Sequence, residues 1–223
     1  MWRRGGTDTA ASRTRGQEFL ASQPPGIPRA STAVVFNDMI NSNLRTGNAE
    51  HDRAIEESGI IPASVALVAA AREAGLPIYW IRVQRRADRT DVFDTLTDDF
   101  IGAGMVPKTP VTRGDHKAAN VDELPVRDED QVILKPRFDP FIGTDLDLRL
   151  RTNGIDTILL GGYSTNIGVE SCARTAKDRN YNVVLLSDCS FNVDVASHEW
   201  TLSKIMPTFA RVMMSHEALG LLA

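Results

Sequence analysis

Six short apolar runs are spaced along the chain, and each has the length and composition of a buried strand. The runs are Thr32–Asp38, Pro77–Val83, Gln131–Lys135, Ile155–Leu160, Tyr181–Asp188 and Ala210–Met214. None shows the strict alternation of apolar and polar residues that marks a strand with one solvated face. Continuous apolar runs of this kind are typical of parallel strands covered on both sides.

Helical patterns lie between most of these runs. Residues 58–74 carry apolar positions at helical spacing, with Pro62 near the start and Gly75 at the end, as is common in helices. Shorter helices are predicted at 168–179, at 197–205 and from the Gly143-Thr144 cap to Asn153-Gly154. Strands alternating with helices predict an α/β fold: a three-layer α/β/α domain around a mostly parallel six-stranded sheet.

Two regions depart from this alternation. Residues 1–30 contain Gly5-Gly6 and Pro24-Pro25-Gly26 without apolar periodicity, which predicts an arm, partly disordered or draped over the domain or a neighbouring subunit. The domain itself is expected to span residues 31–223. Between the second and third strands, residues 91–101 can form a short helix and 102–120 a long loop. A loop of that length is usually a lid, a binding loop or an oligomer contact.

Composition and charge narrow the classes of partner and of site that the protein can have. The net charge of -4 and the hydrophobic content of 42% fit a globular protein and speak against a nucleic-acid or membrane partner. The basic residues between Arg82 and Arg89 are interpreted as an exposed, solvated segment. The two cysteines, Cys172 and Cys189, match no zinc spacing, and no apolar run approaches the ~20 residues of a membrane span. A cytoplasmic location is therefore expected.

Three features fall where α/β proteins bind ligands, at the carboxyl ends of predicted strands. Asp38 ends the first strand and Lys135 the third. The fourth strand feeds a Gly-containing elbow, Gly161 to Ile167, and then a helix that begins near Gly168. A helix start gathers N–H groups and favours negative charge. The alternatives are a turn or capping role for Asp38 and a solvated surface role for Lys135.

These features together resemble the isochorismatase-like hydrolase superfamily, which has the cysteine-hydrolase fold. The resemblance rests on Asp38-Met-Ile-Asn41, on Lys135 followed by Phe141 and Gly143-Thr-Asp-Leu146, and on the elbow. It covers roughly residues 31–219. Gly168 stands where the amidase branches of the family carry the nucleophilic cysteine, and the string from Ser164, Ser-Thr-Asn-Ile-Gly-Val-Glu-Ser, is similar to a subgroup with this replacement. True isochorismatases, which hydrolyse a vinyl ether, also have glycine there.

The resemblance implies a set of site residues. Asp38, Lys135 and Gly168 would form the catalytic group, with Asp38 as acid or base, Lys135 fixing it or contacting a substrate carboxylate, and N–H groups at the helix start stabilising negative charge. The substrate would lie against Phe138, Phe141, Tyr163, Ser164, Thr165, Asn166 and Ile167. In relatives a non-proline cis peptide shapes the elbow; here it would be Tyr163–Ser164.

Other implications concern cysteine, metal and assembly. Cys172 is four residues past Gly168, further along the helix, and is interpreted as a core residue rather than a substitute nucleophile. The metal-binding histidines of the nicotinamidase branch have no counterpart at Arg82-Val-Gln84, so neither a metal nor another cofactor is expected. His198 matches a histidine often present in close relatives, and here it would reach the site or a subunit contact; a surface or capping role is the alternative. Relatives are dimers or tetramers, and the same is expected here.

Three functional hypotheses remain open. The leading one is a metal-free hydrolase that uses Asp38, Lys135 and an activated water to cleave a vinyl-ether or C–N bond in a small polar or carboxylated molecule. Isochorismate itself is disfavoured, because isochorismatases carry Tyr-Ala-His-like residues where this chain has Ser164-Thr-Asn166. The second hypothesis is a non-catalytic small-molecule binder that lost its nucleophile. The third is that Gly168 replaces a cysteine of the native chain.

Overall fold

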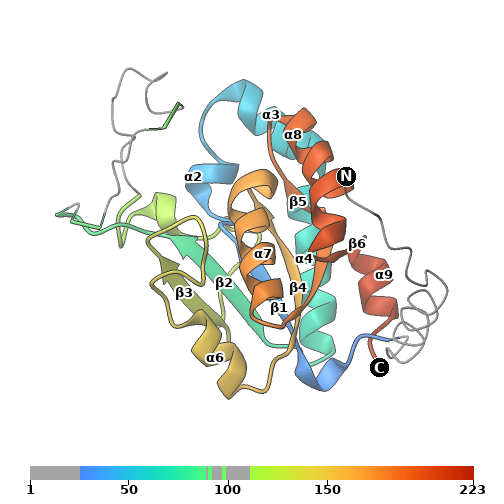
Figure 1. Cartoon of the computed structure of the whole chain (residues 1–223). Helices are drawn as coiled ribbons and strands as arrows, with labels where there is room; N and C mark the ends of the chain where they lie inside the picture. Colours follow the sequence, from blue (N-terminus) through green and yellow to red (C-terminus); the bar gives the residue numbers. More distant parts are fainter. Residues whose placement is uncertain (1–25, 89, 92–96, 99–110) are drawn as a thin grey trace, which may run out of the picture.

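The computed structural model describes residues 26–88, 90, 91, 97, 98 and 111–223. A six-stranded sheet runs through its centre, in the order β3-β2-β1-β4-β5-β6, with every neighbouring pair parallel (Figure 1). The strands are β1 (Thr32–Asn37), β2 (Ile78–Val83), β3 (Gln131–Lys135), β4 (Thr157–Tyr163), β5 (Asn182–Phe191) and β6 (Arg211–Met213). The α/β fold with a six-stranded sheet is thus confirmed, and all of its pairings are parallel.

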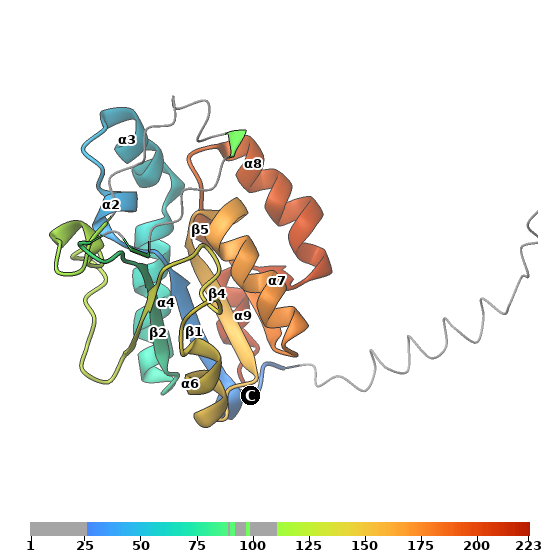
Figure 2. The same cartoon turned by 60° about the vertical axis from the view of Figure 1, so that its left-hand side comes forward.

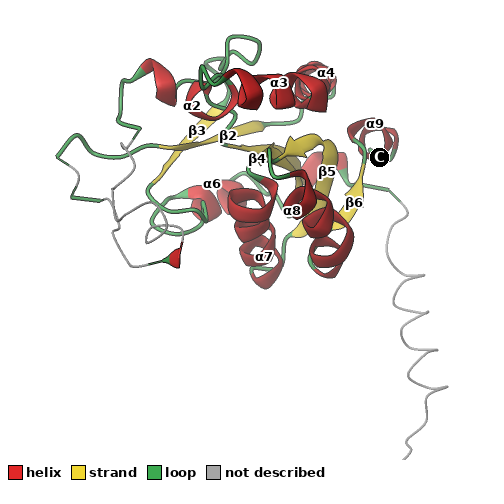
Figure 3. Ribbon diagram, turned by 90° about the horizontal axis from the view of Figure 1, so that it is seen from above, coloured by secondary structure: helices red, strands yellow, loops and turns green. Residues whose placement is uncertain are grey.

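Helices cover both faces of the sheet, so the fold has three layers (Figure 3). One face carries α3 (Ala49–Ser58), α4 (Ile60–Glu73) and α9 (Ser215–Gly220), with α2 (Asn41–Leu44) at its edge. The other carries α6 (Leu146–Thr152), α7 (Glu170–Asp178) and α8 (Val195–Trp200). Short 3-10 turns occur at Arg29–Ser31, His116–Ala118 and Met206–Thr208, and π-helical turns at Thr165–Val169 and Thr201–Ile205.

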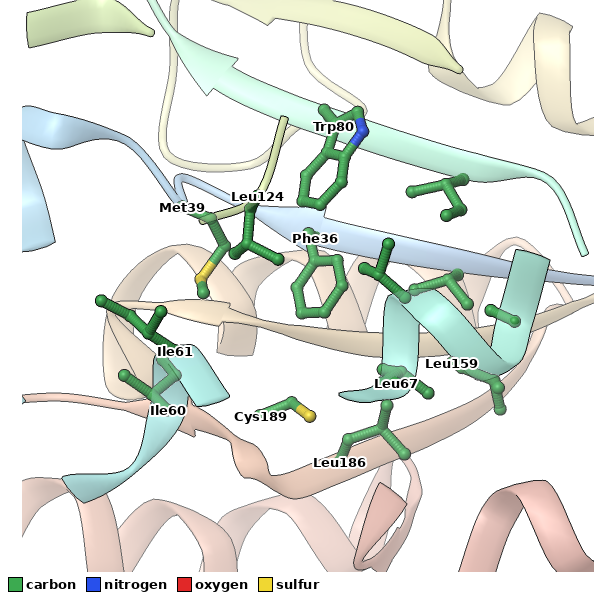
Figure 4. Packing of buried hydrophobic residues seen from close by; sticks show 14 of the residues in the cluster. Phe36, Met39, Ile60, Ile61, Leu67, Trp80, Leu124, Leu159, Leu186 and Cys189 are labelled. Atoms are coloured by element: carbon green, nitrogen blue, oxygen red, sulfur yellow. The ribbon is translucent and has the colours of Figure 1, made fainter. Parts of the chain in front are cut away.

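The alternation of side chains along the strands separates two apolar cores. On β1, Val34 and Phe36 face α4, whereas Ala33 and Val35 face α6 and α7. Phe36 stacks on Trp80 with ring centroids 5.2 Å apart, among the side chains drawn in Figure 4. Because successive residues of a strand point to opposite faces, Asn37 continues the row of Ala33 and Val35 and points toward α7.

The segment between β1 and α4 differs from the expectation. No helix was predicted for residues 41–57, yet α2 and α3 form there. Helix α3 buries little apolar surface besides Ile55, so its pattern carries a weak periodic signal. Its start is stabilised by Asn48, whose side chain accepts from the N–H groups of Glu50 and His51. Gly59, at φ 69°, then ends α3 and separates it from α4.

The ends of the described chain lie together (Figure 2). Ile27 pairs with Leu222, and the Ile27 N–H donates to the Leu221 carbonyl at 2.6 Å. Ile27 is buried, whereas residues 28–30 are exposed. Residues 1–25 lie outside the described residues, as do most of the predicted helix at 91–101 and residues 102–110 of the predicted loop.

Part of that long connection is described. Residues 111–120 form two isolated bridges with segments that follow the strands. Thr112 pairs with Arg85, after β2, and Asn120 pairs with Ile40, after β1. Within the described ranges, no single helix has the length and apolarity to cross a membrane. Helices α3 and α4 pass that test only as a pair, bent by 45°.

Helix α6 offers a matched test of the core. Leu150 is fully buried and Leu148 is 68% exposed on the same helix. We expect Leu150→Ala to lower the free energy of unfolding by about 2–5 kcal/mol, because it removes packed methyl groups and leaves a cavity. Leu148→Ala should change it by less than about 0.5 kcal/mol. Urea unfolding of both variants measures the difference, and equal effects would contradict the described packing.

Candidate active site

The candidate site lies where the strand order reverses. The chain builds β1, β2 and β3 outward in one direction and then returns to place β4 on the other side of β1. Crevices at the carboxyl ends of strands flanking such a switch point are the usual ligand sites of α/β sheets. Asp38 follows β1 directly, and the Ser164–Gly168 segment follows β4, so the topology brings two predicted features to one point.

A buried ion pair joins the third feature to this point. Lys135 Nζ lies 2.6 Å from Asp38 Oδ2, and the lysine and aspartate side chains are 2% and 10% exposed. Asp38 Oδ1 accepts from the Val83 N–H at 2.6 Å. Asp38 has φ 55°, a conformation uncommon for residues with a side chain, and functional sites are where such strained residues concentrate. Both carboxylate oxygens are therefore held by donors.

The Lys135 ammonium has three hydrogen-bond acceptors. Besides Asp38, it donates to Asn37 Oδ1 at 2.8 Å and to the Phe138 carbonyl at 2.9 Å. An ammonium carries three N–H donors, so these contacts use all of them. The expectation that Lys135 contacts a substrate carboxylate does not agree with this geometry. Lys135 instead positions Asp38 and Asn37.

The elbow is shorter than predicted. Strand β4 continues through Tyr163, and a π-helical turn begins at Thr165, so Gly168 lies within the first turn of the helix that leads into α7. The Tyr163–Ser164 peptide is cis, at the position that the resemblance implied. The N–H groups of Ile167 and Val169 both donate to the Ser164 carbonyl, each at 3.2 Å. Those two groups are occupied, and the Gly168 N–H lies between them in the chain.

Polar side chains of the elbow bond mainly to one another. Ser164 Oγ donates to Asn166 Oδ1 at 3.1 Å, and Asn192, just after β5, donates from Nδ2 to both of these side chains. Thr165 is buried, and its Oγ1 lies 2.8 Å from His198 Nδ1. These contacts with Asn192 and His198 stabilise the conformation of the elbow. Burial lowers the pKa of His198, and the Glu199 carboxylate partly offsets this effect. The lowered pKa favours the neutral imidazole at neutral pH.

The remaining predicted contact residues are dispersed. Phe138 is 54% exposed and Ile167 is also exposed, both near the carboxyl edge. Tyr163 is half-buried, and its hydroxyl lies 3.1 Å from His51 Nε2. Phe141 was expected to wall the pocket, but it is 6% exposed and packs in the core against Tyr181. The apolar residues after Lys135 thus divide between the core and the surface.

Asn37 is a site residue that the sequence interpretation missed. Its side chain is buried beside Lys135 and Gly168. A signal was available: Asn37 is polar within a strand otherwise apolar, and it shares the face of Ala33 and Val35. The sequence pattern treats the run as continuously apolar up to Asp38, which hides this one polar position.

The interpretation of residues 82–89 as a solvated basic segment is wrong for two of its arginines. Arg82 Nε donates to Asn120 Oδ1 at 2.8 Å, and Arg85 is buried, with its guanidinium 3.4 Å from the Lys135 carbonyl. Burial lowers the pKa of Arg85, and the Asp91 and Asp38 carboxylates act in the opposite direction. A buried cation therefore lies within electrostatic reach of Asp38.

Two kinds of group bear on alternative chemistry, the cysteines and the potential metal ligands. Both cysteines are free and buried. Burial raises the pKa of the Cys172 thiol far above its usual range and that of Cys189 to about 12. Neither is poised as a thiolate nucleophile. Within the described ranges, no group of three or more His, Cys, Asp or Glu side chains is arranged to hold a metal ion.

Comparisons with known proteins agree on one family. Residues 32–217 match the model of the isochorismatase domain. The uncharacterised isochorismatase family protein YecD of Escherichia coli O157:H7 is 34% identical over 194 residues, covering 86% of this chain and 96% of that protein. The ureidoacrylate amidohydrolase RutB of Methylobacterium radiotolerans is 27% identical, covering 85% and 79%. An isochorismatase family protein from Burkholderia thailandensis superposes with a TM-score of 0.72 at 28% identity, covering 90% and 99%.

The ion pair predicts a large stability effect. Lys135→Met should lower the free energy of unfolding by about 3–5 kcal/mol, because it leaves a buried carboxylate without its counter-charge. Adding Asp38→Asn should restore part of this loss. Lys177→Met, on an exposed position of α7, is the matched control and should have an effect below about 0.5 kcal/mol. Urea unfolding checks all three variants; a double variant less stable than Lys135→Met would contradict the pairing.

Proposed function

The chain belongs to the isochorismatase family and is a hydrolase, and on that premise we propose that it cleaves a C–N bond of a small, carboxylated molecule with water. The observation that carries the proposal is the Asp38–Lys135 pair at the switch point, beside a helix start with no side chain at residue 168. Without a cysteine there, we assign the acid–base role to Asp38, whose ion-pair partner Lys135 lies beside Gly168. The name of RutB, an amidohydrolase acting on a ureido acid, supports a C–N bond over the vinyl ether.

In the proposed reaction Asp38 serves first as a base and then as an acid. Its carboxylate takes a proton from a water molecule as the water oxygen bonds to the carbonyl carbon. The C–N bond then breaks, and the leaving nitrogen takes the proton from Asp38. A carboxylate (or carbamate) and an amine or ammonia result. General acid–base catalysis of this kind contributes about 10²- to 10⁴-fold.

The other groups hold this arrangement. Lys135 remains an ammonium and fixes the direction of the Asp38 carboxylate through their 2.6 Å contact. We assign stabilisation of the negative charge that develops on the carbonyl oxygen to the Gly168 N–H at the helix start. The N–H groups on either side of it donate to Ser164 and are not available. The name of the relative RutB, a ureidoacrylate amidohydrolase, supports a substrate that carries a carboxylate.

Metal-free chemistry is part of the proposal. The donor groups described around Asp38 are an ammonium, a carboxamide and backbone N–H groups, none of which is a usual ligand of a hydrolytic metal ion. Treatment of the enzyme with a chelator should therefore leave its rate unchanged.

Turnover on a panel of small amides, ureido acids and enol ethers tests the proposal. Asp38→Asn should lower kcat by about 10²- to 10⁴-fold on every panel member that the wild type hydrolyses. Asp145→Asn is the matched control, since Asp145 also pairs with a basic side chain, Arg149, but on the surface of α6. Circular dichroism establishes that both variants are folded.

The outcomes separate the hypotheses. Background rates for the wild type and for Asp38→Asn across the panel would favour the non-catalytic binder. Cleavage of enol ethers alone would move the proposal to a vinyl-ether substrate. Loss of activity after chelation would refute metal-free chemistry.

A further inference from the structure

Asn37 fills the space next to Gly168. Its side chain is fully buried at the end of β1, on the face that carries α7. Oδ1 accepts from Lys135 Nζ at 2.8 Å. An ammonium can only donate, so the oxygen must face Lys135 and the amide nitrogen must face the other way, toward Gly168. Within the described part of the chain, Asn37 Nδ2 has no hydrogen-bond partner.

The position of Nδ2 excludes a side chain at residue 168. A β-carbon added to Gly168 would lie 2.3 Å from Asn37 Nδ2 and 3.2 Å from Lys135 Nζ. Two such atoms cannot approach to 2.3 Å, so either Asn37 or the helix would have to move. In the amidases that this chain resembles, the cysteine side chain would occupy this space. Here the carboxamide of Asn37, from β1, already fills it.

The backbone gives no separate reason for glycine. Gly168 is absent from the glycines with positive φ, so a residue with a side chain can adopt its conformation. Glycine inside a helix is disfavoured by about 1 kcal/mol relative to alanine. Space is the remaining explanation, and Asn37 is what occupies it.

Asparagine at residue 37 also requires a reason. Ala33 and Val35 show that this face of β1 accepts apolar residues, and an unpaired buried amide costs about 1–3 kcal/mol. What an apolar side chain would not supply is Oδ1, the acceptor that completes the set of three around the Lys135 ammonium.

We propose that Asn37 is a positioning residue that takes the place of the nucleophile's side chain and holds Lys135, and through it Asp38, for a reaction that uses water. Asn37 and Gly168 then form one unit, in which glycine makes room for the carboxamide. We call the space beside Gly168 that the Asn37 carboxamide fills the slot. The inference about the slot is independent of the proposed function, whereas the inference about catalysis rests on it. The unit also opposes the hypothesis that Gly168 replaces a native cysteine.

A stability cycle tests the slot. Gly168→Ala should lower the urea midpoint in the wild-type background and should raise it or leave it unchanged in an Asn37→Ala background, since alanine is the better helix former. Asn153→Ala is the matched background, because Asn153 Nδ2 donates to the Tyr79 hydroxyl at 2.8 Å at the end of α6. There, Gly168→Ala should again be destabilising. The same shift in all three backgrounds would overturn the proposal.

Thiol reactivity gives an independent reading of the slot. Both native cysteines are buried, so labelling by iodoacetamide reports on a cysteine placed at residue 168. We expect Asn37→Ala/Gly168→Cys to be folded and to label faster than Gly168→Cys, in which the carboxamide and the thiol compete for one space. Intact mass measures labelling over time. Equal rates combined with equal urea midpoints for the two variants would contradict the competition.

Kinetics test the positioning role on a substrate found with the panel. Asn37→Ala should lower kcat by about 10²-fold with little change in KM, as expected for a misplaced catalytic group. Added to Lys135→Met, it should cause no further loss, because its effect acts through Lys135; independent losses that multiply would overturn this role. If the wild type hydrolyses no panel member, the proposed function fails, while the stability cycle still decides the slot.

Discussion

The contact between Lys135 and Asp38 is the interaction on which the site depends. Lys135 ends β3 and Asp38 follows β1, so the 2.6 Å contact reaches past the end of the intervening strand β2. Burying two charges is costly unless each finds its partner and further hydrogen bonds. The Val83 N–H, the Phe138 carbonyl and Asn37 supply those bonds. The three strands must therefore keep their register for the charges to remain paired.

Around this pair the chain has the isochorismatase-family fold, and the proposed reaction uses that fold without a cysteine. The Tyr163–Ser164 peptide is cis, and the helix start follows it directly. The side chain that approaches this point comes from β1 instead of α7. In the proposed reaction, an acid–base pair, a helix start and a carboxamide serve an attack by water and not a covalent intermediate.

Much of the fold could be predicted because it follows from local pattern. Buried parallel strands are continuous apolar runs, and all six were found, although β4 and β5 extend further than the apolar residues do. Helix α3 was missed because its stability comes from the Asn48 cap and the Gly59 end more than from an apolar face. The position of a residue at a strand end was enough to select Asp38 and Lys135, since the carboxyl ends of parallel strands meet at one edge.

The rest of the site depends on three-dimensional contacts that no single segment encodes. Phe141 follows Lys135 as a pocket residue would, but the turn after β3 directs it into the core beside Tyr181. Arg85 lies in a basic segment whose charge suggested exposure, yet it is buried near the end of β3. Asn37 and Gly168 are distant in sequence, and their shared space becomes visible only when β1 and the helix start are placed side by side.

The shared space also imposes an order on how such a site can change. With any side chain at residue 168, the present position of the Asn37 carboxamide is inaccessible, whereas glycine at residue 168 is compatible with either a small residue or asparagine at residue 37. If the proposal holds, a path from a thiol-based to a water-based form passes through glycine at residue 168 before asparagine at residue 37. The return path requires asparagine to leave first. Under the proposal, a side chain introduced at residue 168 alone must compete with the Asn37 carboxamide for one space.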